Sequence, residues 1–203
     1  MGWMRAMGQA ALALAWLAPV TTTDLSASPA LAQSGWEDCA YVPANADAPQ
    51  TVAHCAMVTE SGQLHLAKGQ LDNIAFDTDN LAVVQVGKLF FYVDEDGKAA
   101  QAASVEGHAV EFHEGLAPSP RLVGGHYKIG YVDQKLNLVI PARYDGGLDF
   151  SGGRAQVCRG CTISRDGDYA ELQGGQWGCI DHTGKEVIPV TQPLDGLDCG
   201  TGQ

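Results

Sequence analysis

Two pairs of residues have the types and spacing of a metal or thiol-redox site. Cys158 and Cys161 are separated by two residues, and Cys179 and His182 repeat that spacing after 17 further residues. Sulfur and imidazole ligands in this order are close to those of a four-ligand zinc ribbon, and Cys-x-x-Cys alone is also the motif of thiol–disulfide oxidoreductases. The same cysteines can instead form disulfides, which leaves neither metal ligands nor a reactive thiol.

The full set of cysteines favours disulfides. All six lie after residue 32, and an even number in an exported chain is typical of a disulfide framework, because thiols oxidise outside the cytoplasm. Proximity in the sequence favours the pairs Cys39–Cys55, Cys158–Cys161 and Cys179–Cys199. We therefore expect no metal and no cofactor.

The first 32 residues have the pattern of a signal peptide. Arg5 precedes an apolar run, residues 10–20, and Ala30-Leu31-Ala32 is a small-residue cleavage site. The run is shorter than the roughly 20 apolar residues that cross a bilayer as a helix. The sequence thus predicts a periplasmic or secreted protein that is not inserted in a membrane after cleavage.

Composition and missing motifs exclude other classes. A formal net charge of −12 disfavours binding to nucleic acid or to anionic lipid surfaces. The sequence has no Gly-x-Ser-x-Gly, no His-Glu-x-x-His and no phosphate-binding glycine loop, so we expect no enzyme activity. The acidic pairs Asp77/Asp79 and Asp94/Asp96 supply only part of a calcium loop and are expected to be turn residues.

Four short segments align and indicate an internal repeat. They are AMVTESGQ (56–63), FYVDEDGK (91–98), GYVDQKLN (130–137) and GCIDHTGK (178–185). The expected turn positions are Asp94, Gly97, Asp133, Asp181 and Gly184, where Asp accepts backbone N–H bonds and Gly supplies a positive φ. Leu136 occupies the glycine position of the third copy, so either Asn137 takes over its role or that turn differs.

A second element recurs between these turns. Phe76, Phe112 and Phe150 each follow the preceding turn by 14 or 15 residues, and such regular spacing is typical of repeat architectures. We therefore predict an all-β fold of about four tandem antiparallel hairpin or meander units. The units could form an open array or a small closed ring.

The last two copies resemble the WG repeats. QWGCIDHTGKEVIPV (176–190) and IGYVDQKLNLVIPARYDGGLDFSGGRAQV (129–157) follow the pattern of that family closely, whereas the two earlier copies are degenerate. The resemblance implies a repetitive β structure, often in exported bacterial proteins, and implies no reaction. We assign residues 54–192 to a WG-like β-repeat domain, preceded by a lead-in segment, 33–53, and followed by a tail, 193–203.

Two further features bear on binding. Alternation along strands puts Trp177 at the same position as Phe90 and Ile129, on one face with Tyr92 and Tyr131, where the rings either stack in the core or form a glycan platform. The fourth copy also contains an insertion, residues 159–175, which is either a longer disulfide-closed hairpin or a binding loop.

These observations predict a non-catalytic exported interaction or scaffold protein. Its partner would be a protein or a cell-envelope polymer. Two alternatives stay open: a binder of envelope glycan or peptidoglycan, and a metal or thiol-redox site at Cys158, Cys161, Cys179 and His182.

Overall fold

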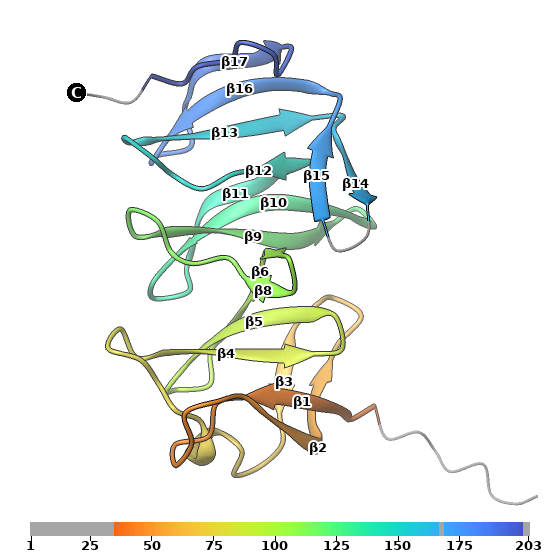
Figure 1. Ribbon diagram of the computed structural model, residues 1–203, viewed down its shortest axis with the longest axis vertical. Coiled ribbons are helices and arrows are strands. Elements are labelled where there is room, and N and C mark those ends of the chain that lie inside the picture. The colour runs from red at the N-terminus through yellow and green to blue at the C-terminus, as the bar shows by residue number, and fades with distance from the viewer. Residues whose placement is uncertain (1–34, 167–168, 201–203) are drawn as a thin grey trace, which may run out of the picture. The chain divides into compact units, whose positions relative to one another are not determined.

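The computed structural model describes residues 35–166 and 169–200 of the chain (Figure 1). The predicted signal peptide lies outside the described residues. The described part is all-β, apart from one turn of 3-10 helix, η1 (Leu71–Asn73). It contains no helix with the length and hydropathy of a membrane span.

Twelve of the strands form four three-stranded antiparallel meanders, which confirms the predicted fold class. The first is β1 (Glu37–Tyr41), β2 (Gln50–Val58) and β3 (Leu64–Leu66), and the second is β4 (Leu81–Val86), β5 (Leu89–Asp94) and β6 (Ala99–Ala102). The third is β9 (Leu116–Val123), β10 (His126–Asp133) and β11 (Leu138–Tyr144), and the fourth is β13 (Arg154–Arg159), β16 (Gln176–Asp181) and β17 (Glu186–Gln192). The first unit thus begins at Glu37, within the segment that we assigned to the lead-in.

Strand pairing joins the first two units, whereas the third and fourth units are separate sheets. β1 pairs with β4, so the first two units share a six-stranded sheet of order β3-β2-β1-β4-β5-β6. The third unit is the sheet β11-β10-β9, and the fourth is extended by β12 (Gly146–Gly147) into the sheet β12-β13-β16-β17. Two short ribbons are added, β7 (Ser104–Val105) with β8 (His108–Ala109), and β14 (Thr162–Asp166) with β15 (Tyr169–Gln173). Within residues 35–166 and 169–200 no strand of the last unit pairs with the first.

The same turn closes the second and third strands of every unit. In the fourth unit the N–H of Asp181 donates to the carbonyl of Lys185 at 3.0 Å, and the N–H of Gly184 donates to the carbonyl of Asp181 at 2.8 Å. The Asp181 carboxylate also accepts the N–H groups of Thr183 and Lys185. Equivalent backbone bonds begin at Thr59, Asp94 and Asp133. The backbone bonds of this turn therefore recur in all four copies, although the third copy has Leu136 at the glycine position.

The third copy has no glycine in this turn, and the residue that adopts the positive φ is not the one that we predicted. Leu136 itself adopts φ +56°, so Asn137 does not take over and the turn keeps its hydrogen bonds. Leu136 is only 3% exposed and belongs to one buried cluster with Ala100. Burial of the leucine side chain, worth roughly 2–3 kcal/mol, offsets the roughly 1–2 kcal/mol that a left-handed residue costs.

A difference in the third strand of the preceding unit explains why Leu136 fits. Tyr92 pairs with Ala100, and at the matching positions Tyr131 pairs with Ile140. A Cβ on Gly184 would lie 2.8 Å from Cγ2 of Ile140, so the fourth unit needs glycine there. A large turn residue thus accompanies a small strand residue in one copy, and the sizes are reversed in the next.

The glycine of the Trp-Gly pair permits a close approach of the third strand. A Cβ on Gly178 would lie 2.5 Å from the carbonyl oxygen of Ile188 and 2.7 Å from the backbone of Pro189. The register shows why. A step of two positions along β16, from Trp177 to Cys179, corresponds to a step of four positions along β17, from Gln192 to Ile188. β17 therefore bulges over Gly178. The second unit has Phe91 at this position, and its β5–β6 register is regular.

One side chain at a fixed position links the second, third and fourth units to the segment that follows each of them. The Tyr131 hydroxyl donates to the carbonyl of Leu148 at 2.8 Å, and the Tyr92 hydroxyl donates to that of Val110. Phe150 and Phe112, two residues further on, pack against these tyrosines. In the last unit Cys179 holds the tyrosine position and bonds covalently to Cys199.

Candidate functional site

A groove with a volume of about 900 Å³ lies at the second unit. Its floor is the face of the six-stranded sheet that carries Val83, Phe90 and Tyr92. Its opposite wall is the stretch 107–112, which begins in the β7–β8 turn and ends at Phe112. Val83 is 42% exposed although it lies in the middle of a central strand. The groove is therefore an uncovered part of an otherwise packed sheet face.

The wall of the second unit differs from that of the third at two positions. Gly146 and Gly147 precede Leu148, whereas their counterparts before Val110 are His108 and Ala109. A Cβ on Gly147 would lie 2.5 Å from the Tyr131 hydroxyl oxygen, so glycine lets this wall lie directly on the strands. In the second unit the Tyr92 hydroxyl also holds the wall on the strands at Val110, and the groove lies beside this contact.

Carboxylates are the only formally charged side chains that line the groove, apart from His108. They are Asp77, Asp79 and Glu111, and neither Lys nor Arg lines it. Asp79 accepts a hydrogen bond of 2.9 Å from the side-chain amide of Gln134, which lies in the turn of the third unit. The surroundings have the same sign, because residues 35–120 contain 13 Asp and Glu against three Lys, a net charge of −10.

Tyr92 lies in the floor as a neutral hydrogen-bond donor. Burial, and then the negative charges of Asp149 and Glu111, raise the pKa of Tyr92 far above its ordinary value. Its ring packs against Phe112, with ring centroids 4.7 Å apart. The groove thus combines a fixed aromatic floor with a negative rim, a combination that suits an apolar ligand with positive charge.

The cysteines are paired as the sequence predicts. The disulfides are Cys39–Cys55, Cys158–Cys161 and Cys179–Cys199, with Cα atoms 5.7, 5.9 and 5.7 Å apart. Because Cys158 and Cys179 bond to different partners, the four-ligand arrangement is not assembled. No group of three metal-ligating side chains occurs within the described residues.

His182 serves a different contact from the one considered for zinc. Its ring stacks on Phe150 with centroids 4.5 Å apart, and its Nε2 lies 3.1 Å from Oε2 of Glu114. Glu114 also accepts the N–H of Gly153 at 2.9 Å. This cluster joins the turn of the fourth unit to the loops that precede β9 and β13, and its described side chains include no nucleophile.

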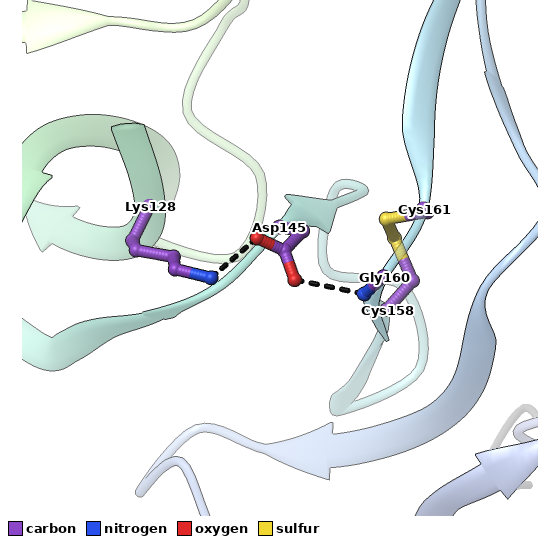
Figure 2. Close-up of polar contacts among 5 residues, drawn as sticks. All are labelled: Lys128, Asp145, Cys158, Gly160 and Cys161. Carbon is purple, nitrogen blue, oxygen red and sulfur yellow. Dashed lines mark hydrogen bonds and ion pairs between the residues drawn. A yellow bond between two sulfur atoms is a disulfide. The ribbon is translucent and has the colours of Figure 1, made fainter. Parts of the chain in front are cut away.

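The Cys158–Cys161 loop is fixed to the third unit by one carboxylate (Figure 2). Asp145 accepts a hydrogen bond of 2.8 Å from the N–H of Gly160 and forms an ion pair with Lys128. Partial burial opposes ionisation, but the bonds from Lys128 and Gly160 outweigh it and lower the pKa of Asp145. An ionised Asp145 in a closed network is structural, since all its contacts are already made.

The aromatic rows considered as a glycan platform are buried. Trp177 is 1% exposed, in a cluster with the Cys158–Cys161 disulfide, and Tyr131 has no exposed surface. A sugar ring cannot stack on rings that are covered in this way, so these rings belong to the core. Within the insertion, 159–175, β14 pairs with β15 as a hairpin, and Leu172 packs on the same cluster.

Sequence reasoning missed the groove, although a signal was present. The second copy departs from the pattern at Phe91 and at the wall residues His108 and Ala109, and the groove lies in this copy. Departures from a repeat rule concentrate where a protein has another use for a position. We treated the degenerate copies as weaker versions of the motif and did not ask what their changes open.

These features define a class: an all-β repeat protein whose units share one turn, and whose third and fourth units also carry a close-approach glycine. Residues 129–160 and 177–191 match the family described as the WG containing repeat. They cover the Trp-Gly position, the turn and the bulged third strand of the third and fourth units. The chain is a WG repeat-containing protein. No curated protein and no solved structure matches it.

Proposed function

We propose that this protein is a non-catalytic interaction module of an oxidising compartment, either the periplasm or the extracellular space. Three disulfides are compatible with such a compartment. The proposed docking site is the groove over Val83, Phe90 and Tyr92. Its occupant is a segment of a protein with both apolar and positively charged side chains.

The observation that carries the proposal is the combination of floor and rim. Val83 and Phe112 offer apolar surface to a ligand, and Asp77, Asp79 and Glu111 surround it without a basic residue. Glu111 makes no side-chain hydrogen bond or ion pair within the described residues, so its charge is available to a partner. Opposite charges on the partner would raise the rate of association and fix its orientation.

Short peptides provide the test. A labelled peptide of alternating Leu and Lys is titrated with the protein, and fluorescence anisotropy gives the Kd. The variant Val83→Lys with Glu111→Lys places two long side chains in the groove and neutralises its three negative charges. It should weaken binding at least about tenfold, which corresponds to about 1.4 kcal/mol.

A matched control separates the groove from net charge. Val187→Lys with Glu60→Lys makes the same change in charge at exposed positions outside the groove. It should bind the Leu–Lys peptide like wild type, and a Leu–Glu peptide should not bind either protein. Equal losses in both variants would show that only the overall charge attracts the peptide, and the groove would not be a docking site.

A further inference from the structure

A second feature of the molecule has the opposite character to the groove. The β9–β10 hairpin exposes three apolar side chains beside its turn: Leu122 is 40%, Val123 is 47% and Tyr127 is 54% exposed. Leu122 pairs with Tyr127 across the hairpin, so these two side chains share one face. Gly124 and Gly125, both at positive φ, form a tight turn that makes the tip narrow.

The charge of this hairpin contrasts with that of the first two units. Residues 115–132 contain Arg121 and Lys128 but neither Asp nor Glu, in a protein with 24 acidic residues. Lys128 is neutralised by Asp145, whereas Arg121 makes no ion pair within the described residues. The hairpin is therefore a narrow apolar tip with a positive flank.

We infer that the groove of one molecule takes the β9–β10 hairpin of a second copy of this chain. The inference rests on the proposed function of the groove and names its partner. Tyr127 and Leu122, on one face of the hairpin, would cover Val83 in the floor, and Arg121, on the other face, would lie toward Glu111 in the opposite wall. One contact thus accounts for both the uncovered sheet face and the exposed tip.

The contact joins two different surfaces, so it is heterologous. Each molecule that donates its hairpin keeps its own groove free, and each molecule that fills its groove keeps its own hairpin free. Contacts of this kind extend head to tail, and they form rings or filaments depending on the rotation between neighbours. The wild-type protein is therefore expected to form a concentration-dependent series of oligomers.

Complementation of two variants gives the test, by sedimentation velocity. The groove variant, Val83→Lys with Glu111→Lys, keeps its hairpin, and the hairpin variant, Leu122→Ser with Tyr127→Ser, keeps its groove. Each should be monomeric alone. An equimolar mixture should form a dimer that does not grow further, because only one functional pair of surfaces remains. Raised salt should weaken assembly.

Controls keep the outcomes separate. Both variants change exposed side chains and should retain the wild-type circular dichroism spectrum, and Ile163→Ser, at another exposed apolar residue, should assemble like wild type. If the tyrosine change disturbs folding, Leu122→Ser alone serves as the hairpin variant. Monomeric wild type at every concentration, or a mixture that stays monomeric, would overturn self-docking. Groove-dependent binding of the Leu–Lys peptide would in that case keep the proposed function, with a different protein as partner.

Discussion

At the scale of single residues, a large turn residue packs with a small strand residue in one repeat, and a small turn residue packs with a large strand residue in the next. Leu136 with Ala100 in one place and Gly184 with Ile140 in the next fill comparable positions with different atoms. Volume-conserving exchanges are the changes that packed interiors tolerate best. The positive φ at Leu136 is accepted because the side chain is buried.

This exchange can be tested by a double-mutant cycle. Gly184→Leu should lower the free energy of unfolding by about 2–4 kcal/mol, through the clash with Ile140 and the left-handed backbone. Ile140→Ala alone should cost about 2–5 kcal/mol. Together the two changes copy the arrangement of Leu136 and Ala100, so the combined loss should fall short of the sum by at least about 1 kcal/mol. Denaturant unfolding measures all three, and strict additivity would contradict the exchange.

At the scale of elements, the glycine of the Trp-Gly motif indicates whether the third strand bulges over the second. Gly178 is required because β17 bulges over it, and Phe91 is allowed because β6 does not bulge over β5. The motif therefore marks two kinds of unit, one with a bulged and one with a regular third strand. The tryptophan itself fills the core beside a disulfide.

Gly178→Ala checks this reading of the motif. The added methyl would lie 2.5 Å from the carbonyl oxygen of Ile188, so the variant should lose at least about 2 kcal/mol of stability. Gly35→Ala is the control, since its Cβ would lie 3.4 Å from Sδ of Met57, and it should change stability by less than about 0.5 kcal/mol. Thermal unfolding compares them, and similar losses in both would remove the close-approach argument.

Elements could be predicted from the sequence where each copy carries its own local signal. Asp94, Asp133 and Asp181 specify their turns through bonds to residues two and four positions on, so spacing alone revealed them. The disulfide pairs followed from proximity. The bulge over Gly178 depends on a neighbouring strand, and the groove beside His108 depends on a neighbouring wall. The residue pattern of a single segment cannot indicate how closely another segment packs against it. The groove was missed for this reason.

At the scale of the whole molecule, carboxylates with lowered pKa values occur in two successive units. Partial burial opposes ionisation of Asp133, but hydrogen bonds from Asn137 and Lys135 outweigh it and lower the pKa of that carboxyl. Bonds from the Thr183 hydroxyl, and from backbone N–H groups, lower the pKa of Asp181. Asp145 is shifted in the same direction. The folded state therefore holds these groups ionised more strongly than the unfolded chain does.

The stability of the fold should consequently decrease as the pH falls into the acid range. A group with a lowered folded pKa contributes stability above its unfolded pKa, near 3.8 for Asp, and loses it as the pH falls through the folded value. The melting temperature should be nearly constant from neutral pH to about 5 and then fall. Asp133→Asn with Asp181→Asn should melt lower at pH 7 and show a shallower acid decline. Parallel curves for variant and wild type would contradict this assignment.

The disulfide between Cys179 and Cys199 should also affect the resistance of the protein to proteolysis. Enzymes that trim a polypeptide from its carboxyl end need a strand that can be drawn away from the body of the fold. Here Cys199 is bonded to a strand of the last meander, and Cys39–Cys55 crosslinks two strands of the first. Digestion should halt at these crosslinks and resume only after a reductant opens them.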